Sequence, residues 1–380
     1  MRPLRLGALA AAVAIPLALV SASPASADAT SLVAVAKAPA STAVPGSYIV
    51  TLKSGAGMPT GVTATHRYRT VLNGFAARLS AGQLDRLRAD SRVAAIEQNQ
   101  VVRADETQSG ATWGIDRIDQ RNLPLSGTYT FTTRAANVHA YVIDTGIQTA
   151  HTEFGGRANN VFDAFGGNGQ DCNGHGTHVA GTIGGSTFGV AKNVRLHGVR
   201  VLNCSGSGSN AGVIAGMDFV RNNHTDPAVA NMSLGGGFST AVNNSANALA
   251  NSGVFLAVAA GNSSANACNS SPSSAANATV AAASSRTDAR ASFSNFGSCV
   301  DLYAPGVDVV SARLGGGSVA FSGTSMASPH VAGVGALYKA TFGNASFSTV
   351  RSFLTGNATP NKITGNPSGT PNLLLFKSTL

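Results

Sequence analysis

The sequence predicts an α/β fold: a large three-layer domain, with a mostly parallel buried sheet and helices on both faces, preceded by a small α+β unit. After residue 105, continuous apolar runs of strand length alternate with helical segments, a pattern typical of a parallel sheet covered on both faces. The 380 residues, 43% hydrophobic and 11% charged, suffice for one large domain and a small one, and they are too apolar for disorder. A polar joint, VVRADETQSGAT at 101–112, separates the two units.

Residues 1–27 are typical of a signal peptide. Arg2 and Arg5 supply a positive end, residues 7–20 are apolar, and an ASA tripeptide offers a cleavage site. The apolar run is too short to cross a bilayer, so we expect a secreted, extracellular protein with no membrane anchor. Residues 28–45, rich in Ala, Ser and Pro, are interpreted as a linker.

The small unit is expected over residues 46–105. The segment SYIVTL (47–52) predicts a strand, and the alternating GFAARL (74–79) predicts another. Ser80 can cap a helix that carries leucines three residues apart. The segment RVAAIEQN (92–99) predicts a third strand. The order is therefore β-β-α-β.

In the large domain, residues 106–380, strand-like and helical runs follow one another along the chain. The active sites of such folds lie at the carboxyl ends of the strands. In order, the runs are VHAYVID (138–144), THVAGTIGG (177–185), VRLHGVRVL (194–202), AGVIAGMDFVRNN (211–223), VANMSL (229–234), AVNNSANALANSG (241–253), VFLAVAAG (254–261), ATVAAAS (278–284), VDLYAPG (300–306) and ASPHVAGVGALYKATF (327–342).

The net charge of +9 does not indicate a nucleic-acid-binding protein, because the excess lies mostly near the N-terminus. Residues 1–105 hold 11 Lys and Arg against 5 Asp and Glu, a net +6, whereas residues 106–380 hold 15 against 12, a net +3. The chain has no run of basic residues interleaved with aromatic ones. We therefore expect neither nucleic acid nor membrane as a partner.

The four cysteines, Cys172, Cys204, Cys268 and Cys299, all follow residue 105. Four cysteines in an exported chain predict two disulfides. Three connectivities are possible, and the spacing alone does not choose among them.

Three segments place chemically useful side chains where strands end or helices begin. Asp144 ends the apolar run in VIDTGI, His175 opens a helix in NGHGTHVAG, and Ser325 lies between a glycine turn and a helix in FSGTSMASPH. Pro329 fits the first turn of that helix, where backbone N–H groups have no intrahelical partner. The order Asp, His, Ser and the lack of a G-x-S-x-G elbow exclude the rival interpretation as a lipase or esterase.

Residues 106–380 resemble the subtilisin-family serine proteases, specifically the proteinase K-like branch, and among these the aqualysin-type enzymes. Residues 46–105 resemble the ferredoxin-like, inhibitor-like propeptide of that family. The resemblance is carried by YVIDTGI, NGHGTHVAGT, NMSLGGG, AVAAGN and FSGTSMASPHVAG in this order, and by DCNGHGTH, VLNCSGSG and WGIDRIDQRNLPL.

The resemblance implies a catalytic role for four residues. Ser325 is the expected nucleophile, His175 the general base, and Asp144 the residue that orients the base. Asn262 is expected to supply the oxyanion hole together with the backbone N–H of Ser325. A metal site at His175 and His178 is disfavoured, because H-x-x-H lacks the spacing and glutamate of H-E-x-x-H. His178 is expected to pack.

Position at a helix N-terminus disfavours an imidazolium, so we expect His175 to be a neutral base at pH 7. A silent relative, the second rival to a protease, would lack a member of the catalytic set. Asp144, His175, Ser325 and Asn262 are all present.

Two glycine-rich segments, GSGS (206–209) and SLGG (233–236), match the substrate-binding strands of the family. Such strands pair with the main chain of a peptide, so sequence selectivity should be broad. No acidic residue lies in either segment, which predicts an apolar or aromatic residue before the scissile bond. The residues expected to bind substrate are Gly206, Ser207, Gly208, Ser233, Leu234, Gly235, Ala259 and Gly261.

The resemblance also implies the disulfides Cys172–Cys204 and Cys268–Cys299, and calcium as a structural ion. Asp116, Asp119 and Gln120 match one calcium site, and their oxygens are of the kind that calcium prefers. Asp301, with carbonyl groups near 275–277, matches a second. Solvated loop carboxylates remain the alternative for the first site.

The expected protein is a secreted, calcium-stabilised, monomeric serine endopeptidase made as a precursor. Its propeptide should assist folding, inhibit the cleft and be removed by self-cleavage near residues 103–107. The resemblance indicates Glu106 as the first residue of the mature chain.

Overall fold

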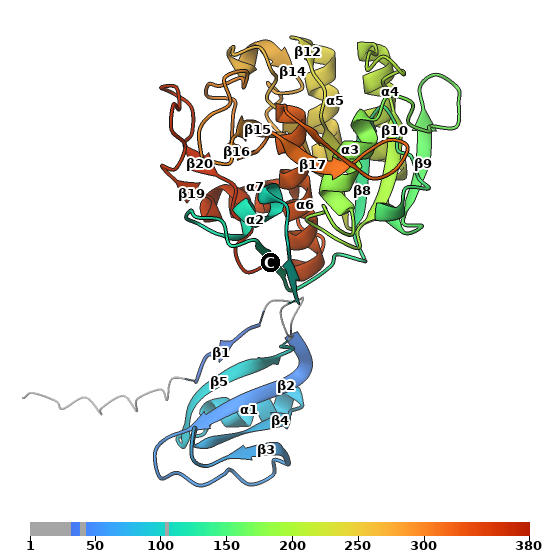
Figure 1. Cartoon of the computed structure of the whole chain (residues 1–380). Helices are drawn as coiled ribbons and strands as arrows, with labels where there is room; N and C mark the ends of the chain where they lie inside the picture. The colour runs from blue at the N-terminus through green and yellow to red at the C-terminus, as the bar shows by residue number, and fades with distance from the viewer. Residues whose placement is uncertain (1–31, 39–42, 103–105) are drawn as a thin grey trace, which may run out of the picture. The chain divides into compact units, whose positions relative to one another are not determined.

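A computed structural model describes residues 32–38, 43–102 and 106–380, which form two compact units (Figure 1). The signal-peptide prediction over residues 1–27 lies outside the described residues. In the described part of the chain, no helix has both the length and the apolar character needed to cross a membrane.

The small unit is a five-stranded sheet with one helix, in the order β1-β5-β2-β4-β3. Strands β2, β4 and β3 pair antiparallel, and β1 pairs parallel with β5. Its core includes Val50, Phe75, Leu87 and Ile96. The elements are β1 (Val35–Ala36), β2 (Ala43–Leu52), β3 (Ala64–Tyr68), β4 (Gly74–Arg78), α1 (Ala81–Ala89) and β5 (Val93–Gln100).

Two strands of this unit differ from the prediction. Strand β3, with the sequence ATHRY, was missed because its residues are polar and exposed, as suits an edge strand. Strand β1 lies in the segment interpreted as a linker and is only two residues long. The predicted helix cap is confirmed: Ser80 accepts from Gln83 N–H, and the Gln83 side chain accepts from Ser80 N–H.

The large unit is built on a nine-stranded sheet in the order β19-β20-β16-β15-β13-β11-β8-β10-β9. Every ladder is parallel except that between β19 and β20, and β11, β13 and β15 are buried along their whole length. This confirms the predicted mostly parallel buried sheet. The strands are β8 (His139–Asp144), β9 (Ala158–Asp163), β10 (Arg195–Arg200), β11 (Ala228–Met232), β13 (Phe255–Ala259), β15 (Thr279–Ser284), β16 (Leu302–Pro305), β19 (Thr359–Pro360) and β20 (Leu373–Leu374).

Helices cover both faces of this sheet. Side chains alternate between the two faces of a strand, so Leu196 and Val199 of β10 face opposite ways. Gly184 of α3 packs against Leu196, and Gly216 of α4 packs against Val199. Helix α6 packs on α3 and on five strands of the sheet, and α5 packs on α4. The helices are α3 (His175–Gly184), α4 (Asn210–Asn223), α5 (Thr240–Asn251), α6 (Thr324–Phe342) and α7 (Phe347–Asn357).

Short elements surround the large sheet. Strands β6 and β7 pair antiparallel, as do β12 with β14 and β17 with β18. Their bounds, with those of the short helices, are β6 (Glu106–Ser109), α2 (Trp113–Asp119), β7 (Thr128–Phe131), η1 (Thr152–Phe154), β12 (Gly236–Gly237), η2 (Ala267–Asn269), β14 (Ser270–Ser271), β17 (Val309–Ala312) and β18 (Ser318–Phe321).

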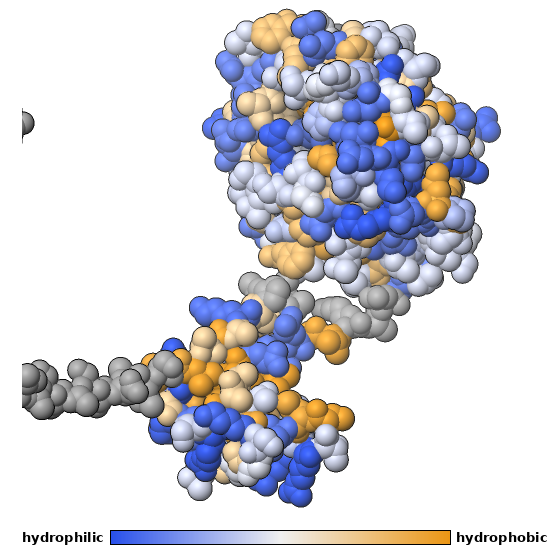
Figure 2. Space-filling view, turned by 90° about the vertical axis from the view of Figure 1, so that its left-hand side faces the viewer, coloured by the Kyte–Doolittle hydropathy of each residue, from blue (hydrophilic) through white to orange (hydrophobic). Residues whose placement is uncertain are grey.

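Two disulfides, Cys172–Cys204 and Cys268–Cys299, confirm the expected pairing. The first fastens the segment just before α3 to the loop that follows β10. The visible face of the large unit in Figure 2 carries apolar side chains scattered among polar ones rather than gathered in one broad patch.

Candidate active site

The predicted Asp, His and Ser come from three elements at the carboxyl edge of the central strands. Asp144 is the last residue of β8, His175 the first of α3, and Ser325 the second of α6. His175 Nδ1 lies 2.8 Å from Asp144 Oδ1 and 3.0 Å from Oδ2. The carboxylate is fully buried, whereas 27% of the imidazole surface is exposed. A buried carboxylate therefore orients an accessible histidine.

The start of α3, which holds His175, is fixed by side chains outside the helix. The first backbone N–H groups of a helix have no intrahelical partner. Here each of the first four, counted from the N-cap Gly174, has one: Gly174 N–H donates to Asp171 Oδ1, His175 N–H to Asn173 Oδ1, Gly176 N–H to Thr145 Oγ1, and Thr177 N–H to Asp171 Oδ2. Gly176 also approaches the turn after β8 so closely that a Cβ would collide with the Gly146 carbonyl oxygen.

The pKa of His175 is raised from its ordinary value. Burial alone would lower it, but the negative charges of Asp144 and Asp171 and the hydrogen bond to Asp144 outweigh burial. The sequence-based argument from the helix N-terminus pointed the other way. That argument weighed the helix dipole and left out the carboxylates, of which Asp144 raises the pKa most and Asp171 adds to it.

Ser325 is tied to the end of β11. Its Oγ donates to the Ser233 carbonyl at 3.1 Å, and Ser233 Oγ donates to the Ser325 carbonyl at 2.7 Å. Asn231 extends this link, because its Nδ2 donates to Ser233 Oγ and its Oδ1 accepts from Ser328 Oγ. The hydroxyl of Ser325 thus faces Ser233 rather than His175. Hydrogen bonds between a nucleophile and its base often tighten only with substrate bound.

Asn262 presents its amide group to the cleft. Its Oδ1 accepts from both the N–H and the hydroxyl of Thr324, at 2.8 and 2.9 Å, which fixes the orientation of the amide. A Cβ added to Gly323 would lie 3.5 Å from Asn262 Nδ2 and 3.6 Å from the backbone nitrogen of Ser325. Two N–H donors therefore flank one small space that only a glycine leaves open.

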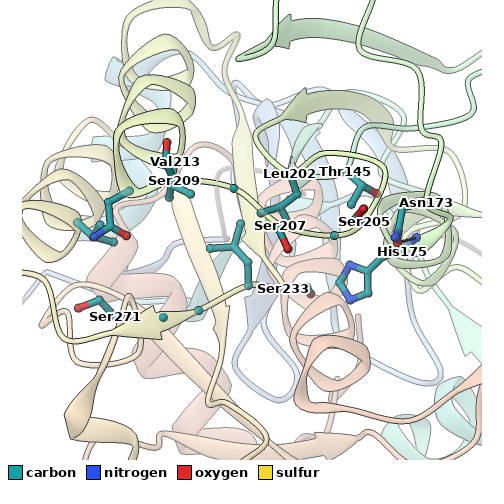
Figure 3. A pocket seen from close by; sticks show the side chains of 17 residues that line it. Thr145, Asn173, His175, Leu202, Ser205, Ser207, Ser209, Val213, Ser233 and Ser271 are labelled. Carbon is teal, nitrogen blue, oxygen red and sulfur yellow. Dashed lines mark hydrogen bonds between the residues drawn. The ribbon is translucent and has the colours of Figure 1, made fainter.

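Two cavities meet at this edge of the sheet. The larger, of about 580 Å³, lies between segments 205–210 and 233–236, with His175 on one side and Ser271 on the other (Figure 3). The second, of about 320 Å³, is lined by segments 234–237 and 259–263 and by Ser325. All eight residues predicted to bind substrate line one or both cavities: Gly206, Ser207, Gly208, Ser233, Leu234, Gly235, Ala259 and Gly261.

The sequence model of the "Subtilase family" matches residues 137–372, more than half of the chain. The chain belongs to the subtilase family. The model described as "Peptidase inhibitor I9" matches residues 47–105. The expected family and its inhibitor-like propeptide are thus confirmed.

This subtilase is similar to named proteinases over most of its length. It is 52% identical over 313 residues to the "Extracellular serine proteinase" of Thermus sp. (strain Rt41A), which covers 81% of this chain and 76% of the relative. It is 42% identical over 345 residues to "Proteinase R" of Parengyodontium album, with 87% and 88% covered. The "Crystal structure of a cold adapted subtilisin-like serine proteinase" superposes with a TM-score of 0.70, 51% identity, and 72% and 99% covered. The chain is a subtilisin-like serine proteinase.

Sequence reasoning missed Thr145 and Asp171, which support the start of α3 in this subtilase. Thr145 follows Asp144 directly, and Asp171 precedes His175 by four residues. A search for Asp, Asn, Ser or Thr just before a predicted helix would have found Asp171. No pattern near α3 would have found Thr145, which lies directly after β8. Several apolar residues of the larger cavity were also missed: Leu202, Val213 and Val242.

Among the predicted metal ligands, Asp116 of α2 and Gln120, which follows α2, both contact the loop that comes next. Asp116 Oδ1 and Gln120 Oε1 both accept from Ser126 N–H, at 3.2 and 2.9 Å. The carbonyl oxygens of Asn122 and Pro124 lie within hydrogen-bond distance of Gln120 Nε2. These hard oxygen donors are of the type that calcium takes, so the loop over 116–126 fits the ion.

Asp119 does not join this loop. Its Oδ1 lies 2.9 Å from the ammonium of Lys377, which is 3% exposed, and its Oδ2 accepts from Thr130 N–H. In this structure Asp119 is thus paired with a cationic side chain, and its role as a metal ligand stays a prediction. Lys377 is 258 residues away in the chain, which is why sequence spacing did not reveal the pair.

Asp301, predicted to hold a second calcium ion, is bound by Arg351 in this structure. Arg351 Nε donates to Asp301 Oδ1 at 2.8 Å, and Arg351 Nη1 donates to the Ala276 carbonyl at 3.1 Å. A guanidinium therefore binds the carboxylate and the carbonyl oxygen that the predicted site would need. In the described part of the chain, no cluster of three His, Cys, Asp or Glu side chains could hold a metal.

Three partly or fully buried histidines make the folded state sensitive to acid. Burial lowers the pKa of His178, His197 and His330 from 6.5 to about 4. His178 does not join His175: its Nε2 faces the carbonyls of β17 and β18, and its ring stacks on Phe321. The prediction that His178 packs in the interior is thus confirmed.

We expect the free energy of unfolding to fall as the pH is lowered from 6.5 to about 4. In this window the unfolded chain binds protons that the folded chain does not, which favours unfolding. Each of the three histidines contributes up to about 3 kcal/mol to this loss of unfolding free energy. His175, whose pKa is raised, offsets the loss only in part. Urea titrations of the covalently inhibited protein at pH 7 and 4.5 measure the loss. Equal free energies at the two pH values would contradict the assignment, and His197→Gln should reduce the difference.

Proposed function

We propose that this subtilase is a secreted endopeptidase of broad specificity, with Ser325 as nucleophile, His175 as general base and Asp144 as the residue that orients the base. The observation that carries the proposal is the hydrogen bond from His175 Nδ1 to the buried Asp144, with His175 lining the larger cavity and Ser325 and Asn262 lining the adjoining one. Secretion is supported by the signal-peptide pattern and by the printed description of the Thermus relative as extracellular.

In the proposed reaction, the Oγ of Ser325 attacks the scissile carbonyl carbon, and His175 Nε2 takes the proton. Asp144 stabilises the imidazolium that forms, in keeping with the raised pKa of His175. The oxyanion accepts hydrogen bonds from Asn262 Nδ2 and the backbone N–H of Ser325. His175 then gives its proton to the leaving amine, and water hydrolyses the acyl-enzyme by the same steps.

The second cavity is the proposed site for the side chain that precedes the scissile bond. Its lining holds Ala, Gly, Ser, Asn, Thr and Leu and no charged residue. A lysine or arginine side chain would be desolvated there without a partner, at a cost that an apolar side chain avoids. The glycine-rich segments 206–209 and 233–236 would pair with the substrate main chain.

We expect the purified mature enzyme to cut denatured casein mostly after apolar or aromatic residues. Mass spectrometry of the products identifies each cut bond, and protein treated with a serine-directed sulfonyl fluoride is the control for contaminating proteases. A majority of cuts after Lys or Arg would overturn the specificity argument without affecting the catalytic assignment.

The precursor is proposed to process itself, with the unit over residues 46–105 acting as intramolecular chaperone and inhibitor and the mature enzyme acting as a monomer. Support comes from the match of residues 47–105 to the inhibitor family. A cut before Glu106 would leave β6 intact, because Glu106 is its first residue and pairs with Phe131 of β7. Glu106 also pairs with Arg134, which would hold the new N-terminus.

Calcium is proposed as a structural ion at the loop over 116–126, held by Asp116, Gln120 and nearby carbonyl groups. When bound, it would neutralise Asp116 and fix the loop. We expect EDTA to lower the melting temperature of the sulfonyl-inhibited enzyme and Asp116→Asn to abolish this calcium dependence. Asp301→Asn should retain the calcium dependence, because the Asp301 carboxylate is hydrogen-bonded to Arg351. An EDTA effect that disappears in Asp301→Asn and persists in Asp116→Asn would reverse the assignment.

A further inference from the structure

We propose that Asp171 is a positioning residue for the reaction, which joins the base-bearing start of α3 to the end of β8 that carries Asp144. The inference rests on the proposed function of His175 and Asp144. Asp171 is 8% exposed and lies in the segment between β9 and α3.

The Asp171 carboxylate accepts five hydrogen bonds. Its Oδ1 accepts from the N–H groups of Asn173 and Gly174 and from Thr145 Oγ1, each at 2.9 Å. Its Oδ2 accepts from Thr177 N–H at 2.9 Å and from Thr177 Oγ1 at 2.6 Å. One side chain thus holds both sides of the turn that presents His175. Charge-assisted hydrogen bonds of this kind are stronger than neutral ones.

Thr145 carries the link across to β8. Its Oγ1 donates to Asp171 and accepts from Gly176 N–H, the residue after His175. Asp144 precedes Thr145 directly, and Thr145 N–H donates to Asp144 Oδ1 at 2.7 Å. Any shift of α3 relative to β8 must break this chain. Small misplacements of a catalytic group can cost on the order of 10²-fold in rate.

Asp171 also acts on the proton affinity of the base. The charged and titratable groups that act on His175 are Asp144 from β8, Asp171 from the preceding segment and His178 from α3 itself. His178, whose pKa is about 4, is neutral above pH 5. Loss of the Asp171 charge therefore lowers the pKa of His175, while Asp144 remains in place.

Two variants separate the charge from the linkage. Asp171→Asn keeps the shape but removes the charge, and its amide NH₂ must face either the Thr177 N–H or the donors on the other side. Thr145→Val keeps the shape and every charge but removes the hydrogen bonds of the hydroxyl to Asp171 and Gly176. Asp163→Asn is the matched control, because Asp163 is a carboxylate with 3% side-chain exposure that also accepts from loop N–H groups, those of Phe165 and Gly169.

For Asp171→Asn we expect kcat to fall on the order of 10- to 100-fold, with KM unchanged within about twofold. We also expect the acid limb of the pH profile, the range over which kcat/KM rises as His175 loses its proton, to move to lower pH. For Thr145→Val we expect a lower kcat with the acid limb unmoved, and Thr145→Ser should restore kcat. Asp163→Asn should lower the melting temperature and leave the limb in place. All are made as the full chain and assayed after processing.

The inference is overturned by a matured Asp171→Asn enzyme with unchanged kcat and acid limb, or by Thr145→Val with unchanged kcat. If Asp171→Asn yields no folded enzyme, the comparison of Thr145→Val with Thr145→Ser tests the inference, because these two variants differ in whether the hydroxyl is present. An inactive wild type would instead refute the proposed function, so the two failures are distinguishable.

Discussion

The Ser325→Ala chain is expected to accumulate as uncut precursor without measurable proteolysis. The variant lacks the proposed nucleophile, which is the second residue of α6 and lines the same cavity as Asn262. Loss of such a serine lowers kcat on the order of 10⁶-fold. If the chain processes itself, the same loss blocks the cut before Glu106. N-terminal sequencing and intact mass of the secreted protein measure both effects at once.

The matched control is Ser328→Ala, one turn further along α6. Ser328 is fully buried, and its Oγ donates to Asn231 Oδ1 at 2.6 Å, so its loss costs stability but no reacting group. Ser328→Ala should therefore be processed at Glu106 and be active. A Ser325→Ala chain that is cut normally, in a host without other proteases, would show that processing is not intramolecular or that Ser325 is not the nucleophile.

Replacement of Asn262 by alanine is expected to lower kcat by roughly 10²–10³-fold and to leave KM nearly unchanged. The reason is geometric: Thr324 holds the amide oxygen, so the NH₂ group is directed to the space beside the Ser325 backbone nitrogen. A donor that acts on the developing oxyanion contributes to the transition state more than to the bound substrate. Steady-state kinetics on a short peptide measure the two constants separately.

Asn266→Ala is the control for this prediction. Asn266 lies four residues away and caps η2 by accepting from Cys268 N–H, but it does not line the cavity. Its variant should be less stable and catalytically normal. Equal loss of kcat in the two variants, or a rise in KM alone for Asn262→Ala, would contradict the oxyanion assignment.

The sequence was sufficient to predict the layers and the buried parallel sheet, because continuous apolar runs of strand length, such as residues 138–144 and 254–261, are typical of strands that are buried on both faces. It failed at strand β3 (Ala64–Tyr68), whose polar residues carry no period, and at β1, which is too short to show one. Edge strands are defined by their neighbours more than by their own side chains.

The candidate site divides in the same way. Asp144, His175, Ser325 and Asn262 follow strand ends and helix starts, so local sequence and the family resemblance predict them together. The supporting contacts join residues far apart in the chain, as Lys377 does with Asp119 and Arg351 with Asp301. Such pairs depend on how the elements pack, so no local sequence pattern predicts them. The same holds for the link from Thr145 to Asp171.

Ser325, activated by His175 and Asp144, is the group that we propose cuts peptide bonds. The most direct measurement is to titrate the processed protein with a radiolabelled serine-directed sulfonyl fluoride, to follow casein hydrolysis in parallel, and to map the label by mass spectrometry. We expect one label per chain on Ser325, activity falling in proportion to labelling, and no label on urea-denatured protein. Casein hydrolysis that persists after Ser325 is fully labelled, or a label on another residue that tracks the loss of activity, would contradict the account.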